Sequence, residues 1–266
     1  MSPKGRQSKS KARLSNYDKL VSEENKQQEE KIELYIPAGP RLGTNVIEAN
    51  GVSKAFGDKL LYEDLNFKLP PAGIVGIIGP NGAGKTTSFY MIVGLIKPNG
   101  GSIHLDKKDI TKFPMYKRAQ HGIGYLAQEA SVFRKLSIED NIMSVLQLTD
   151  LNKKEREEKM ESLIDEFSLN HIRTNRGDLL SGGERRRTEI ARALATDPSF
   201  ILLDEPFAGV DPVAVEDIQR IVAQLKNKNI GILITDHNVQ ETLAITDRTY
   251  LMFEGSILKH GIPEEL

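Results

Sequence analysis

The stretch GIIGPNGAGKTTSFYMIVGLI, from Gly76 to Ile96, decides the fold of this chain. Its centre, GPNGAGKT, fits the pattern G-x-x-x-x-G-K-[ST], and it lies between a strand-like apolar run and a run with helical spacing. In this context, backbone N–H groups and a helix N-terminus cradle phosphate. We therefore predict a P-loop formed by Gly79, Pro80, Asn81, Gly82, Ala83, Gly84, Lys85, Thr86 and Thr87.

Two side chains of this loop have separate roles in the prediction. Lys85 is expected to reach the β- and γ-phosphates, and Thr86 is expected to place its hydroxyl on Mg²⁺. At average glycine usage, such a match occurs by chance roughly once in a hundred chains of this length. The flanking strand and helix lower that chance further, so the pattern indicates a phosphate-binding loop rather than a glycine-rich turn.

Composition excludes several classes of protein. The 266 residues carry a formal net charge of -1, so no overall field favours nucleic acid or a membrane surface. The chain has no cysteine, which excludes disulfides and thiolate metal sites. Its longest apolar runs are too short to span a bilayer, and its basic N-terminus lacks the apolar core of a secretory signal. We expect a cytoplasmic protein that reaches the membrane only through partner subunits.

The chain divides into a polar start and a folded remainder. Residues 1–43 are basic, then acidic, and end in the linker-like run IPAGPRLG, so we expect a disordered tail or a solvated helix there. In residues 44–266, short apolar runs such as GILITDH alternate with helical patterns. This alternation predicts an α/β fold with a mainly parallel sheet flanked by helices.

The run FILLDEP places two carboxylates directly after four apolar residues. On a buried strand that ends at the phosphates, Asp204 is expected to hold the metal with its water shell. Glu205 is expected to polarise the attacking water as general base. A solvated acidic turn would give the same letters, but the P-loop upstream favours the catalytic interpretation.

The string LLSGGERRRTEIARAL resembles the signature motif of ATP-binding cassette (ABC) ATPases. Ser181, Gly182, Gly183 and Glu184 begin an amphipathic helix and leave its N-terminus open to an anion. The resemblance implies a head-to-tail homodimer, in which these residues contact ATP held on the partner's P-loop. It also implies an antiparallel β-subdomain and a helical subdomain at about residues 125–180.

Other landmarks of the ABC family follow in order. The resemblance assigns Gln128 to the Q-loop, where it binds nucleotide and metal, and Asp211 to the D-loop. It makes His237 the switch histidine and places Phe56 where an aromatic ring stacks on adenine. The catalytic set is therefore Glu205, His237 and Lys85, and the metal set is Thr86, Gln128 and Asp204.

The likeness divides at the P-loop. From there to the end, about two thirds of the chain, the text resembles the ATPase subunit of lipopolysaccharide-export transporters. In that family, residues at the positions of Ser131, Val132, Phe133 and Arg134 receive the membrane subunits. The text of the same family runs on past HGIPEEL, so a truncated C-terminal tail is expected.

Residues 1 to about 78 instead resemble the linker and second-cassette start of ABC-F translation-throttle ATPases, which bind the ribosome. A recombinant gene, a join of two sequences at the shared P-loop, and a transporter ATPase with a divergent start would each produce this pattern. The likeness to a mid-protein linker favours a join. The expected function is ATP hydrolysis that powers lipopolysaccharide export. The alternatives are an ABC-F fragment or the ATPase of another ABC transporter.

Overall fold

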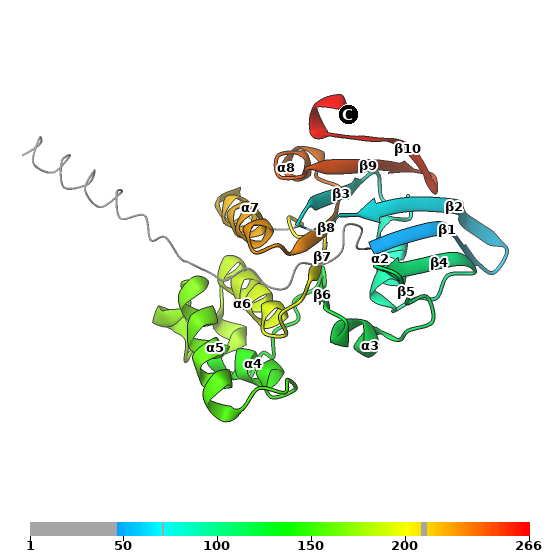
Figure 1. Cartoon of the computed structure of the whole chain (residues 1–266). Coiled ribbons are helices and arrows are strands. Elements are labelled where there is room, and N and C mark those ends of the chain that lie inside the picture. The colour runs from blue at the N-terminus through cyan, green and yellow to red at the C-terminus, as the bar shows by residue number, and fades with distance from the viewer. Residues whose placement is uncertain (1–46, 71, 209–211) are drawn as a thin grey trace, which may run out of the picture. The chain divides into compact units, whose positions relative to one another are not determined.

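Two β-sheets carry the described part of the chain, which comprises residues 47–70, 72–208 and 212–266 of the computed structural model (Figure 1). The smaller sheet is antiparallel and has the strand order β2-β1-β4-β5. Its strands are β1 (Ile47–Phe56), β2 (Lys59–Leu69), β4 (Gly100–Leu105) and β5 (Lys108–Asp109). This sheet corresponds to the predicted antiparallel subdomain.

The larger sheet has the strand order β10-β9-β3-β8-β7-β6, and its strands are parallel except for β10. They are β3 (Ile74–Ile78), β6 (Ile123–Leu126), β7 (Phe200–Asp204), β8 (Gly231–Asp236), β9 (Arg248–Phe253) and β10 (Ser256–Gly261). Every residue of β3, β7 and β8 is buried, as expected for parallel strands covered on two faces. The mainly parallel sheet predicted from the sequence is thereby confirmed.

Helices cover the two faces of the larger sheet (Figure 1). The helices of the described residues are α2 (Lys85–Val93), α3 (Met115–Gln120), α4 (Ile138–Leu146), α5 (Lys153–Glu166), α6 (Gly182–Leu194), α7 (Pro212–Asn227) and α8 (Val239–Leu243), of which α4 and α5 pack on other helices rather than on the sheet. Short 3-10 turns occupy Asn170–Ile172, Gly177–Leu179 and Pro263–Glu265. Among the described residues, no helix is both long enough and apolar enough to cross a membrane.

Alternation along the strands separates two hydrophobic cores. On β7, Phe200 and Leu202 join the core shared with α2 and the antiparallel sheet, whereas Ile201 and Leu203 join the core shared with α4 to α7. Successive strand residues point to opposite faces, so one buried strand supplies both cores. Because α4 contacts α5 and α6, these helices form one cluster beside the sheet. The predicted domain boundaries stay a prediction, and residues 1–43 lie outside the described residues.

A buried arginine holds the C-terminal end of α2, the helix that follows the P-loop. Arg118 of α3 is 1% exposed and donates to carbonyl oxygens of Met91 and Ile92, each at 2.6 Å. It also donates to the carbonyls of Phe113 at 2.9 Å and Thr111 at 3.0 Å. Burial lowers the pKa of this guanidinium to about 10. The cation complements the negative end of the helix dipole and fixes α2 against α3.

We expect Arg118→Met to lower the free energy of unfolding by at least about 3 kcal/mol, because buried carbonyls left without donors each cost roughly 1–3 kcal/mol. Urea denaturation would measure the loss. Gln120→Ala changes an exposed residue of the same helix and should stay within about 0.5 kcal/mol of the wild type. A loss of unfolding free energy below about 1 kcal/mol for Arg118→Met would contradict a stabilising role for its hydrogen bonds to the four carbonyl oxygens.

Candidate functional site

The P-loop connects β3 to α2 through a backbone that glycine alone tolerates. Gly79 has φ 152°, and a Cβ built there would lie 2.0 Å from the Met252 carbonyl oxygen. Gly84 has φ 102°, and a Cβ there would lie 3.0 Å from the Tyr62 ring. Neither position admits a side chain without a shift of its neighbours. The loop therefore presents backbone rather than side chains at the N-terminus of α2.

Lys85 is the first residue of α2 and is only 4% exposed. Its ammonium donates to the carbonyl oxygens of Gly79 at 2.6 Å and Pro80 at 3.0 Å. Burial lowers the pKa of this lysine, and the charges of Glu205, Asp236 and Asp204 oppose that shift. The cation thus lies within the loop, where it can change partners from loop carbonyls to phosphate oxygens.

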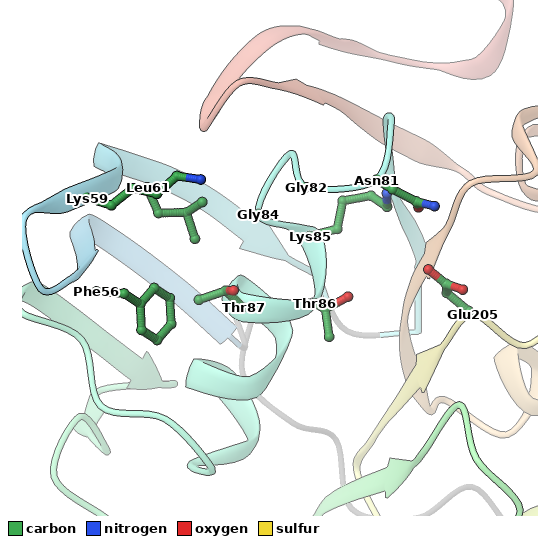
Figure 2. Close-up of a pocket in the computed structure, with 10 residues that line it drawn as sticks. All are labelled: Phe56, Lys59, Leu61, Asn81, Gly82, Gly84, Lys85, Thr86, Thr87 and Glu205. Carbon is green, nitrogen blue, oxygen red and sulfur yellow. The ribbon is translucent and has the colours of Figure 1, made fainter.

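A pocket of about 300 Å³ lies over the loop, and Figure 2 shows the side chains around it. Phe56 and Glu205 lie on opposite sides of Thr86 and Thr87 in this view. The lining residues are Phe56, Lys59, Leu61, Asn81, Gly82, Gly84, Lys85, Thr86, Thr87 and Glu205. The predicted aromatic residue and the predicted P-loop residues are therefore brought together. Lys59 and Leu61 on β2 were not predicted, because they belong to no recognisable motif in the sequence.

Asp204 ends β7 with its carboxylate fully buried. The Thr235 hydroxyl donates to its Oδ1 at 2.7 Å, whereas the buried Oδ2 has no hydrogen-bond partner. Burial raises the pKa of this carboxyl group, since no cation compensates the desolvation fully. A buried oxygen without a partner is what an absent ion leaves behind. The three residues predicted to hold the metal, Thr86, Gln128 and Asp204, each have a side-chain oxygen, which is the type of ligand that Mg²⁺ prefers.

Glu205 follows Asp204 with φ 43°, in the left-handed region. Its N–H donates to the Thr235 carbonyl at 2.7 Å, and its Oε2 accepts from the Gln128 amide at 2.7 Å. The Nδ1 atom of His237 lies 3.5 Å from the same Oε2. Residues predicted as Q-loop, general base and switch histidine therefore meet at one carboxylate oxygen.

Two residues at the end of β8 belong to this site and were not predicted. Thr235 and Asp236 are fully buried, and they directly precede His237. The Asp236 carboxylate accepts from the N–H of Phe207 at 3.2 Å and from the N–H of Asn238 at 2.8 Å. The available sequence signal was the change from an apolar run to polar residues in GILITDH.

The signature residues lie at the N-terminus of α6 but do not line the pocket of their own chain. Ser181 is the N-cap: its hydroxyl accepts from the Glu184 N–H, and its own N–H and hydroxyl donate to Glu184 Oε2 at 2.8 Å and 2.7 Å. These donors hold the pKa of Glu184 below its usual value. Asp211, the residue predicted for the D-loop, lies outside the described residues.

The segment Ser131–Arg134 is held by side chains of α6. Glu189 accepts from the Ser131 N–H at 2.6 Å, and Arg192 donates to the Ser131 carbonyl at 2.6 Å. Arg192 also lies over the Phe133 ring, 4.6 Å from its centroid. Because Phe133 remains 49% exposed while Val132 is buried, the segment presents an aromatic surface on a fixed backbone.

Comparison with known proteins agrees with this geometry. The model of the family described as ABC transporter matches residues 62–208. A "Probable ABC transporter ATP-binding protein" of Azorhizobium caulinodans is 52% identical over 227 residues, which are 85% of this chain and 81% of the relative. The "Lipopolysaccharide export system ATP-binding protein LptB" of Haemophilus influenzae is 51% identical over 223 residues, 84% of this chain and 92% of that protein.

The solved dimer of MJ0796, a bacterial ABC transporter cassette, has the same fold, with a TM-score of 0.72 at 22% identity over 82% of this chain and 98% of that one. Fewer than 223 residues follow Gly79, so the alignment with the Haemophilus protein extends upstream of the P-loop. The likeness to transporter ATPases is thus not confined to the residues after the loop. This chain belongs to the ABC transporter family, as one of its ATP-binding and ATP-hydrolysing subunits.

Proposed function

We propose that this subunit powers lipopolysaccharide export, at the inner face of the inner membrane and together with integral-membrane subunits. The observation that carries the proposal is the likeness to the export protein of Haemophilus influenzae along nearly the whole length of that relative. The likeness to the Azorhizobium protein, whose name states no transported substrate, supports the alternative of another ABC transporter.

We assign MgATP to the pocket over the P-loop. Phe56 would stack on the adenine, and the backbone of Gly79–Thr87 would bind the phosphates. Thr86, Gln128 and Asp204 would hold Mg²⁺, and the partnerless Asp204 Oδ2 supports this assignment. When bound, Mg²⁺ supplies positive charge that offsets the charge of the phosphate oxygens.

Hydrolysis follows from the residues around Glu205. The oxygen of water attacks the γ-phosphorus, the bond to the β-phosphate oxygen breaks, and ADP departs. Glu205 accepts the proton of the water, while the Gln128 amide and His237 keep its carboxylate oriented. Lys85 exchanges its loop carbonyls for phosphate oxygens and stabilises the charge that develops there.

A second copy of the chain would complete the site. Ser181, Gly182, Gly183 and Glu184 begin α6 but do not line the pocket of their own chain, so head-to-tail pairing would bring them to the partner's ATP. We assign Asp211 to the same interface. The dimeric arrangement of the solved cassette MJ0796 supports this pairing.

We assign Ser131, Val132, Phe133 and Arg134 to the contact with the membrane subunits. Phe133→Glu should abolish co-purification with those subunits, because a carboxylate would be desolvated in an apolar contact. ATP hydrolysis by the isolated subunit should remain. Leu258→Glu, at an exposed apolar residue of β10, is the matched control and should keep co-purification. Retained co-purification of Phe133→Glu would remove this segment from the interface.

The assignment to export is tested by replacement. An Escherichia coli strain depleted of its own export ATP-binding protein receives this chain, and growth and co-purification with the export membrane subunits are measured. Growth with the wild type, but not with Glu205→Gln, supports export. ATP hydrolysis without co-purification or growth would assign the subunit to a different ABC transporter.

We further propose a separate origin for residues 1 to about 78, as the end of an ABC-F linker and the start of its second cassette. The basic composition of the first residues and the run IPAGPRLG support it, whereas the alignment with the Haemophilus protein upstream of the P-loop favours a transporter ATPase with a divergent start. Sequencing reads of the source DNA across Gly79–Thr87 test the proposal. Reads that diverge inside the P-loop would separate two proteins. Reads that span the loop would make a single gene and leave ribosome binding as the property to assay.

A further inference from the structure

Residues at the end of β8 make three hydrogen bonds to the end of β7 and to the residues that follow it. The Thr235 hydroxyl donates to Asp204 Oδ1 at 2.7 Å, and the Thr235 carbonyl accepts the Glu205 N–H at 2.7 Å. One residue further along β8, Asp236 Oδ2 accepts the N–H of Phe207, which lies two residues beyond Glu205, at 3.2 Å. The second contact continues the parallel ladder of β7 and β8, whereas the first joins two side chains and the third lies beyond the ladder.

Asp236 is an unusual residue for this position, because its carboxylate is fully buried at the end of a fully buried strand. Burying a carboxylate is costly unless hydrogen bonds or charges compensate for the lost water. Its carboxylate accepts from the N–H groups of Phe207 and Asn238, and the Nδ1 atom of His237 lies 3.6 Å from Oδ1. The charges of Lys85 and Arg186 also act on it. A threonine or valine would fill the strand at lower cost.

The two oxygens of Asp236 serve two different segments. Oδ1 accepts the N–H of Asn238 at 2.8 Å, two residues ahead, and so fixes the turn that carries His237 into α8. Oδ2 reaches Phe207, two residues beyond Glu205. One rigid group thus joins the backbone that bears His237 to the backbone that bears Glu205.

We propose that Asp236 is a positioning residue for ATP hydrolysis, whose carboxylate sets the register of Glu205 against His237. The inference rests on the hydrolytic function proposed above and adds a residue to it. Glu205 does not fix its position relative to His237 by itself. Its backbone has φ 43°, and its N–H is bound by the Thr235 carbonyl of the adjacent strand. A small misplacement of a reacting group can cost about a hundredfold in rate.

Asp236→Asn tests the proposal with almost no change in volume. An asparagine side chain has one oxygen that accepts and one NH₂ that donates, so it can keep only one of the two N–H contacts. We expect kcat to fall about 10- to 100-fold. We expect KM and the Kd for ATP to change less than about threefold, since the pocket does not include Asp236.

Thr249→Val is the matched control for lost stability. Thr249 is fully buried on β9, which lies in the same sheet on the far side of β3, and its hydroxyl bonds to that of Thr246 at 2.8 Å. The Thr249→Val variant should have a lower Tm than the wild type and an unchanged kcat. Should Asp236→Asn fail to fold, Asp236→Ser provides a second variant, which removes the contact to Phe207 with a smaller side chain and should show the same loss of kcat.

Each outcome decides the proposal. A lower kcat at constant Kd for ATP supports positioning by Asp236. An unchanged kcat overturns it, and so does a parallel loss of kcat, ATP affinity and Tm, which would make Asp236 a residue of the fold alone. If the wild type releases no phosphate from ATP, the proposed function and this inference fail together. If the wild type turns over and Asp236→Asn matches it, only the inference fails.

Discussion

Glu205→Gln should reduce ATP turnover by at least about 10²-fold, because a general base contributes typically 10²- to 10⁴-fold to the rate. The amide keeps the size of the side chain and its acceptor for Gln128, but it cannot take the proton from water. ATP binding should remain, since the P-loop and Lys85 are unchanged. With hydrolysis blocked, ATP should accumulate between two subunits and hold them as a dimer. Phosphate release, the Kd for ATP and light scattering measure the three quantities.

Glu254 provides the matched control for this substitution. It lies in the turn between β9 and β10, is exposed, and has φ 44°, nearly the φ of Glu205. Glu254→Gln should hydrolyse ATP at the rate of the wild type and remain free of a trapped dimer. Wild-type turnover in Glu205→Gln would remove the assignment of general base, whatever the control shows.

Lys85→Ala should weaken ATP binding by at least about 100-fold, because hydrogen bonds to charged groups contribute roughly 1.5–3 kcal/mol each. The substitution removes the buried cation over which the phosphates would lie. It also removes the two hydrogen bonds that the ammonium donates to the carbonyl oxygens of Gly79 and Pro80. Equilibrium titration with a fluorescent ATP analogue gives the change in Kd.

Lys59→Ala separates the loss of phosphate contacts from a general loss of charge in the pocket. Lys59 lines the same pocket from β2 and is exposed. Its removal should change the Kd less than about tenfold, as expected for an exposed charge. Comparable losses for the two variants would mean that the pocket attracts ATP through its overall charge and not through a P-loop contact.

The sequence predicts those parts of the fold whose signals are local. The apolar runs that become β3, β7 and β8 are short and end in turn residues or carboxylates, so they are recognisable as buried parallel strands. The P-loop is recognisable because its glycines are required by the backbone itself. The burial of Arg118 among four carbonyl oxygens is not predictable. Its partners come from separate segments, and they are main-chain atoms that every residue type has.

The same distinction applies to the site. Glu205 was predicted from the run FILLDEP, whereas Gln128 and His237, which lie against it, were assigned only through the family resemblance, since no spacing in the sequence relates three separate loops. The hydrogen bonds from Thr235 and Asp236 to the end of β7 and the residues after it depend on which strands are adjacent and in what register they pair. That information lies in the pairing of β7 with β8 and not in either strand alone.

The backbone of Glu205 has a consequence for how this protein can change. A residue other than glycine in the left-handed region lowers the stability of the folded state by about 1–2 kcal/mol. Glycine or asparagine would adopt φ 43° more easily than glutamate does, but neither could accept the proton of water at the same place. Selection for thermal resistance alone would therefore enrich inactive variants at this position. Only selection on hydrolysis keeps the glutamate.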